Sequence, residues 1–153
     1  TLNKGKSVTT VKGEWDNTCS YIRIQSIMHS GKFDVEQHVE ASMMDCEMLN
    51  LILQPLVENA IGHGLDHKEG NGKKKLWVSG REAGDVLEFE VKDNGCGIPE
   101  EDIEAVLHTQ TKGYGLSNVN HRIKLYYGEA YGLQMESRLG EGTRVLVRIP
   151  KKN

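Results

Sequence analysis

The segment Val86–Asp93 constrains the fold most, because it has the pattern of a strand but ends with a charged side chain on its apolar face. One face carries Leu87, Phe89, Val91 and Asp93, and the other carries Glu88, Glu90 and Lys92. A buried carboxylate without a partner is unfavourable, so Asp93 requires a hydrogen-bond donor. That donor is either the backbone of its own Asp-Asn-Gly turn or a flat ligand, which Gly95 and Gly97 would let approach the backbone closely.

The remaining hydrophobic pattern predicts helices that alternate with strands. The predicted helices cover residues 14–28, 45–64, a short segment from Pro99, and 115–127, and the other predicted strands cover residues 32–41, 76–81, 131–138 and 143–149. We expect Asp45 to be the N-cap of the second helix and Pro55 to bend that helix by removing a backbone donor. Two pairs of consecutive strands form predicted hairpins. The fold class is therefore α+β, a two-layer sandwich with helices on one face of a sheet.

Composition limits the classes of function. A chain of 153 residues fits one domain, and 19 basic against 22 acidic residues give a net charge of −3, so bulk charge does not favour nucleic acid or a membrane surface. Cys19, Cys46 and Cys96 are odd in number and widely spaced, which argues against a disulfide framework or a zinc site. The chain has no long apolar run and begins with Thr1, so we expect a piece of a larger protein whose membrane anchor, if any, lies elsewhere.

The second predicted helix carries polar pairs on both flanks of its apolar stripe. In the run Leu53-Gln-Pro-Leu-Val-Glu-Asn-Ala-Ile-Gly-His-Gly, Asn59 and His63 share one flank, while Gln54 and Glu58 share the other. The flanks are either solvated, as in an ordinary amphipathic helix, or part of a site that a second element completes.

A third segment has the chemistry of a phosphate-binding turn. Gly113 and Gly115 frame a turn that opens the last helix, whose free N–H groups and dipole favour an anion, and Lys112 adds a full positive charge. The turn does not directly follow a strand and lacks the Gly-x-x-x-x-Gly-Lys-Ser/Thr pattern, so neither a Rossmann nor a P-loop site fits. Together with a carboxylate that could accept from an adenine amine, the segment indicates an ATP site of another nucleotide-binding fold.

These motifs resemble the ATP-binding domain of the GHKL superfamily, which includes gyrase, a heat-shock chaperone ATPase, mismatch-repair ATPases and sensor histidine kinases. The run from Leu53 to Gly64, the earlier Tyr21-Ile-Arg-Ile-Gln, the later Gly115-Leu-Ser-Asn-Val-x-x-Arg-Ile and Gly140-Glu-Gly-Thr-Arg-Val are similar to histidine kinases of the LytS/YesM type. The resemblance implies the Bergerat fold, in which a mixed sheet is backed by three helices and a mobile lid covers ATP. It places the domain at residues 14–150, after an extension or upstream helix tail at 1–13.

The resemblance also implies roles for individual residues. Asn59 would bind Mg²⁺ and phosphate, Asp93 would accept from the adenine amine, Thr143 would reach the adenine through water, and the lid would span about residues 98–111. The residues expected to contact ATP are Asn59, His63, Asp93, Gly95, Gly97, Ile98, Lys112, Gly113, Tyr114, Gly115, Leu116 and Thr143. Glu58 is a candidate catalytic residue that would order the metal's water or polarise an acceptor.

The implied function is phosphoryl transfer from Mg-ATP to a histidine of an upstream dimerisation domain, with a response regulator as the next partner. The parent protein would be a homodimer anchored in the bacterial inner membrane, with this domain in the cytoplasm. Pro55 and Gly62 stand where many histidine kinases have Asn and Lys, and none of the six histidines has a phosphoacceptor context. Two alternatives therefore stay open: an anti-sigma serine kinase of the same superfamily, and a nucleotide-binding module that has lost its chemistry.

Overall fold

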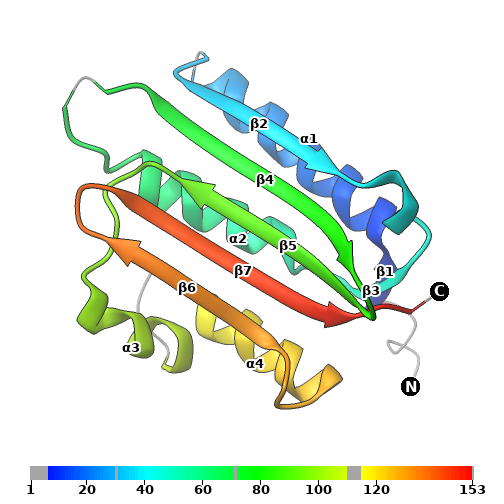
Figure 1. Ribbon diagram of the computed structural model, residues 1–153. Helices are drawn as coiled ribbons and strands as arrows, with labels where there is room; N and C mark the ends of the chain where they lie inside the picture. The colour runs from blue at the N-terminus through cyan, green and yellow to red at the C-terminus, as the bar shows by residue number, and fades with distance from the viewer. Residues whose placement is uncertain (1–6, 30, 71, 110–114, 153) are drawn as a thin grey trace.

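The computed structural model describes residues 7–29, 31–70, 72–109 and 115–152, which form a mixed five-stranded sheet with helices on one face (Figure 1). In spatial order the strands are β2 (Phe33–Val39), β4 (Lys74–Ala83), β5 (Val86–Asp93), β7 (Gly142–Pro150) and β6 (Gly132–Arg138). The pair β2 and β4 is parallel, whereas the other neighbouring strands are antiparallel. The α+β class, the mixed sheet and both hairpins are confirmed.

The helical layer buries the odd-numbered side chains of β5 and β7. It consists of α1 (Val11–Met28), α2 (Leu53–Asn59), its π-helical continuation η3 (Ala60–Leu65) and α4 (Leu116–Tyr127). The 3-10 turn η4 (Glu100–Asp102) leads into the short helix α3 (Ile103–His108), which lies beside β6 in Figure 1. Phe89 and Val147 are fully buried at the centre of this core, because alternate residues of a strand face the same side.

The predicted start of the second helix is wrong. Residues 41–49 form the 3-10 turn η2 (Ala41–Met43) and strand β3 (Glu47–Leu49), which pairs antiparallel with β1 (Val8–Thr10). The helix begins only at Leu53, so Asp45 is not its N-cap. Pro55 consequently lies in the first turn, where its missing N–H removes no helical hydrogen bond, and the expected bend has no cause.

The first helix starts three residues earlier than expected. The Thr10 hydroxyl accepts from the Gly13 backbone N–H at 3.1 Å and caps α1, which therefore begins at Val11. In the part of the chain that the structure describes, no helix has the length and apolarity needed to cross a membrane.

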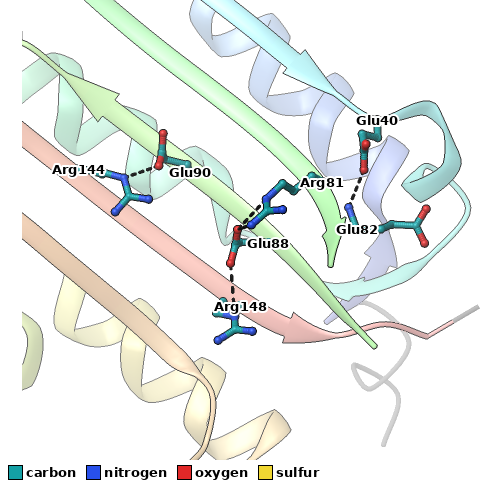
Figure 2. A network of polar contacts seen from close by, with 7 residues as sticks. All are labelled: Glu40, Arg81, Glu82, Glu88, Glu90, Arg144 and Arg148. Carbon is teal, nitrogen blue, oxygen red and sulfur yellow. Dashed lines mark hydrogen bonds and ion pairs between the residues drawn. The ribbon is translucent and has the colours of Figure 1, made fainter. Parts of the chain in front are cut away.

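The sheet face opposite the helices is covered by charged side chains that pair across strands (Figure 2). Glu88 of β5 accepts from Arg81 of β4 and also pairs with Arg148 of β7, while Glu90 pairs with Arg144. Such partly exposed pairs add little stability each, but they keep this face polar. The apolar side chains of the sheet therefore have one place to pack, and the predicted two-layer arrangement follows.

Candidate functional site

Asp93 is the last residue of β5 and lies almost completely out of solvent, with 3% of its surface exposed. Burial raises the pKa of its carboxyl to about 6, and the backbone N–H groups of Gly95 and Thr143 and the charge of Lys68 oppose that rise. The Gly95 N–H donates to Oδ1 at 2.8 Å. Asp93 thus closes its own turn, as one reading of the sequence expected, yet its two oxygens have further lone pairs for a ligand.

Three glycines are required by close approaches around this carboxylate. A Cβ on Gly64 would lie 2.5 Å from Asp93 Oδ1, and a Cβ on Gly95 would lie 2.1 Å from the Gly64 carbonyl carbon. Gly97 has φ +75° and a Cβ there would lie 1.9 Å from the Arg138 carbonyl oxygen. Sequence reasoning identified Gly95 and Gly97 but missed Gly64, whose signal was a second glycine within one helical turn of Gly62.

The π-helical turn η3 holds the loop after β5 against the end of α2. The Cys96 backbone N–H donates to the Gly64 carbonyl at 3.1 Å, and the Cys96 thiol donates to the His63 carbonyl at 3.1 Å. A π-helical turn is uncommon and occurs frequently at functional sites. Here it directs carbonyl groups at the loop, so that the helix and the loop form one wall.

Asn59, the last residue of α2, is 5% exposed, and its Oδ1 is buried without a hydrogen-bond partner among the described residues. Such an atom is unusual, because buried polar atoms are almost always paired. Asn59 lines a narrow pocket. The other lining residues come from η3, from the end of β5 and the loop that follows it, and from β7. The pocket is lined by Asn59, His63, Gly64, Asp93, Gly97, Ile98 and Thr143.

This pocket is narrow, with a volume of about 10 Å³, roughly the space of one water molecule. A wider open hollow of about 720 Å³ borders it at Asp93 and Thr143 and extends along β6 to Ile103 of α3. The hollow does not reach Asn59, so the narrow pocket is where the predicted residues converge. A ring the size of adenine fits only if the pocket widens.

Ser137 is a pocket-supporting residue that sequence reasoning missed. Its Oγ accepts from the Ile98 N–H at 2.7 Å and lies 3.0 Å from the Gly142 carbonyl and 2.7 Å from Thr143 Oγ1. It therefore ties the start of the predicted lid to the β6–β7 turn. Residues 110 and 111 of the predicted lid lie outside the described residues. The signal was its inward position on the predicted strand 131–138, where a polar side chain needs a partner.

Glu58 does not reach the pocket. It is exposed on the flank of α2 that faces α1, where the Gln54 amide donates to its Oε2 at 2.9 Å. The Asn17 amide of α1 in turn donates to Gln54 at 2.7 Å. This flank is a contact between two helices, so the two polar pairs of the predicted helix have different surroundings.

The phosphate-binding segment is described only in part, since Lys112, Gly113 and Tyr114 lie outside the described residues. Gly115 is the N-cap of α4 with φ +69°, and no side chain caps this helix end in the described part of the chain. Leu116 is fully buried, so it anchors the helix in the core and leaves only its backbone for a ligand. In Figure 1 the ends of β5 and η3 and the start of α4 lie at the same end of the sheet.

Comparison with known proteins gives the family. The family described as "Histidine kinase-, DNA gyrase B-, and HSP90-like ATPase" matches residues 44–153. The chain belongs to this ATPase family. The GHKL resemblance of the sequence motifs is thereby confirmed, and the matched region contains every residue expected to contact ATP.

Several relatives are sensor kinases. The chain is 36% identical to the sensor histidine kinase YpdA of Escherichia coli over 93% of its own length, 33% identical to the sensor protein LytS of Bacillus cereus over 91%, and 30% identical to the sensor histidine kinase YesM of Bacillus subtilis over 99%. It spans only 24%, 24% and 26% of their respective lengths. The expected similarity to LytS and YesM is confirmed.

Solved structures agree with the fold. The nucleotide-free catalytic domain of histidine kinase ThkA superposes with a TM-score of 0.71, covering 94% of this chain and 95% of that one at 16% identity. At this identity the match shows the fold alone. The chain thus has the fold and the family of the ATP-binding catalytic domains of histidine kinases.

Proposed function

We propose that the chain binds Mg-ATP in the Asn59–Asp93 pocket and transfers the γ-phosphoryl group to a histidine of an upstream dimerisation domain of the same protein. The observation that carries the proposal is that three groups lie at one end of the sheet: a desolvated carboxylate, an amide oxygen and the N-terminus of α4. Among the described residues the amide oxygen has no hydrogen-bond partner and no side chain caps that helix end. A carboxylate suits the adenine amine, and helix N–H groups suit phosphates. Sensor kinases among the relatives favour this reading over an anti-sigma serine kinase or a silent module.

The donor set fits magnesium. Mg²⁺ prefers oxygen ligands and usually takes one or two from the protein, with phosphate oxygens and water completing its shell. Asn59 Oδ1 is such an oxygen, and no cluster of three His, Cys, Asp or Glu side chains competes for a metal among the described residues. Bound Mg²⁺ would neutralise charge on the phosphates, while the chain itself orients the nucleotide and excludes water.

The proposal assigns a role to the residues of the predicted ATP site. Asp93 accepts from the adenine amine, Gly95 and Gly97 let the ring lie against the backbone, and the N-terminus of α4 binds the phosphates. The terminal phosphoryl group then passes to an imidazole nitrogen, which loses its proton, and ADP is left. Glu58 remains a prediction as a catalytic residue, and it would have to act from the α1 side of α2.

The test combines binding and transfer. Calorimetric titration should give ADP binding that is stronger with Mg²⁺ than with EDTA, and Asn59→Ala should remove most of that difference. Labelled ATP should phosphorylate an added upstream helical fragment of the parent protein and leave this chain unlabelled. An acid-labile, base-stable label on this chain alone, or no effect of Mg²⁺ on ADP affinity, would contradict the proposal.

The wider context is proposed on the same basis. A response regulator would accept the phosphoryl group from the histidine, and the parent would act as a homodimer through regions outside this chain. The expected anchoring of the parent in the inner membrane, with this domain in the cytoplasm, is part of the same proposal.

A further inference from the structure

The turn that precedes α2 is held in an unfavourable conformation by two charged side chains from other helices. We call residues 50–53 the α2 anchor. Leu51 has φ +54°, a left-handed conformation that is rare for a residue with a branched side chain, and its side chain gains little from packing because 47% of the residue is exposed. Such a conformation persists only where surrounding contacts determine it.

Glu14 of α1 supplies the first set of contacts. It is 3% exposed, and its Oε1 accepts from the Leu51 N–H at 2.9 Å, while Oε2 accepts from the N–H groups of Ile52 and Leu53 at 2.9 and 2.8 Å. The N-cap residue of α2 makes no side-chain capping bond of its own. Glu14 therefore caps α2 from a different helix, with a carboxylate at the positive end of the helix.

Arg122 of α4 supplies the second set. Its Nη1 donates to the Leu51 carbonyl at 3.0 Å, and its Nη2 donates to the Asn50 carbonyl at 3.0 Å and to Asn50 Oδ1 at 3.2 Å. The Leu51 N–H is thus bound by a side chain of α1, and the Leu51 carbonyl by a side chain of α4. The α2 anchor joins α1, α2 and α4 through charged hydrogen bonds, which are stronger than neutral ones.

We propose that Glu14 and Arg122 are positioning residues that set Asn59 in register with the N-terminus of α4. Leu53 begins the helix that ends at Asn59, about 9 Å away at 1.5 Å per residue. Arg122 lies about two helical turns after Gly115, the N-cap residue of α4. Fixing the α2 anchor therefore fixes Asn59 Oδ1 relative to the N-terminus of α4. The inference rests on the proposed function, in which the end of α2 at Asn59 and the N-terminus of α4 bind the same Mg-nucleotide.

The variants Glu14→Gln and Arg122→Lys test the inference. The first keeps the size of the side chain but removes its charge, and the second keeps the charge but loses the forked donor geometry. The quantity measured is the ratio of ADP affinity with Mg²⁺ to ADP affinity with EDTA. We expect each variant to lower this ratio roughly two- to thirtyfold, the range typical of residues that couple two sites. ADP affinity in EDTA should change much less, because adenine recognition does not depend on Asn59.

Matched controls come from the opposite side of the molecule. The Glu40 carboxylate accepts from the Glu82 N–H at 2.7 Å, and Arg148 pairs with Glu88 (Figure 2). Neither control residue lines the pocket. Glu40→Gln and Arg148→Lys should leave the ratio unchanged. Amide exchange at residues 51–53 without nucleotide should become faster in Glu14→Gln, which shows directly that the α2 anchor has loosened.

The outcomes separate this inference from the proposed function. If wild type shows no Mg²⁺-dependent ADP binding, the proposed function fails. If wild type shows it and both variants keep the wild-type ratio, or lose affinity equally with and without Mg²⁺, Glu14 and Arg122 have only a structural role and the inference is overturned. Should Glu14→Gln not fold, Arg122→Lys alone decides. The double variant should lower the ratio by less than the product of the single effects, because both residues act through one turn.

Discussion

Replacing Asp93 by Asn should make the nucleotide-free protein more stable at neutral pH while weakening its binding of ADP. The pocket buries the carboxylate beside Gly64, and its pKa is raised to about 6 mainly by that burial. Below about pH 3 the group is neutral in both the folded and the unfolded chain. As the pH rises through 6, the folded protein has to ionise a poorly solvated group, and stability is lost.

The size of this loss follows from the pKa. A rise from 3.8 to about 6 corresponds to about 3 kcal/mol of stability that is present at acid pH and absent above pH 7. Asp93→Asn keeps an oxygen that can accept from the Gly95 N–H but has no charge to bury. Relative to wild type, the variant should therefore gain up to about 3 kcal/mol between pH 3 and pH 7.

The effect on binding has the opposite sign. Losing a charge-assisted hydrogen bond to the adenine amine should weaken ADP binding by about 1.5 to 3 kcal/mol, or roughly ten- to a hundredfold. Wild type should also bind GDP poorly, because the guanine carbonyl would oppose the carboxylate. Below pH 6 the affinity of wild type for ADP should approach that of the variant. Titration of the ADP phosphates affects binding to both proteins, so the variant controls for it.

Urea unfolding at several pH values and calorimetric titration with ADP and GDP measure these effects. Stability curves of wild type and Asp93→Asn that run parallel from pH 4.5 to pH 8 would show that the buried carboxylate does not titrate near 6. Equal ADP affinity in the two proteins would leave Asp93 with its turn alone and remove it from the site.

Gly64→Ala should fold but lose ADP binding, because the new methyl group would lie 2.5 Å from the Asp93 carboxylate oxygen; titration calorimetry measures this. Backbone amides of residues 98–109 should exchange fast without nucleotide and slowly with an ATP analogue, because this acidic segment has few apolar anchors. Tyr127→Phe should destabilise the protein by about 1 to 2 kcal/mol in urea unfolding, since the hydroxyl accepts from the Leu49 N–H at 2.8 Å.

Substitutions of the same type at neighbouring positions serve as controls. Gly62→Ala should bind ADP normally, since a Cβ there meets no described atom within 4 Å. Tyr126→Phe should be nearly neutral because 45% of Tyr126 is exposed. Uniform slow exchange across residues 98–109 without ligand would contradict the idea of a mobile lid, and normal ADP binding by Gly64→Ala would contradict the tight packing around the carboxylate.

The sequence predicted those elements whose signal is local and repeated. Strand β5 has the predicted bounds because strict alternation over eight residues has one register that buries its apolar face. The same alternation placed Asp93 on the inward side before any ligand was considered. The helical periodicity of the second predicted helix likewise placed Asn59 and His63 on one flank, and both residues line the pocket.

Features that depend on distant partners were missed. Asp45 has the chemistry of an N-cap, but β3 pairs with β1 across almost forty residues, and that pairing decides the conformation of this stretch. Glu14 lies 37 to 39 residues before the amides that it accepts from. Nothing local distinguishes it from a solvated glutamate in the first turn of a helix, where acidic residues are common.

Two buried polar groups that destabilise the nucleotide-free fold indicate where the ligand binds. The buried carboxylate of Asp93 lowers stability in the nucleotide-free protein, and so does Asn59 Oδ1, which has no hydrogen-bond partner within residues 7–29, 31–70, 72–109 and 115–152. Both residues line the same pocket. The left-handed Leu51 is also unfavourable, but Glu14 and Arg122 satisfy its backbone groups, so its cost is offset inside the fold. An amine donor at Asp93 and a cation at Asn59 would supply partners that the described part of the chain does not. Because one nucleotide with its metal brings both, binding should stabilise this fold more than its contact area alone would suggest.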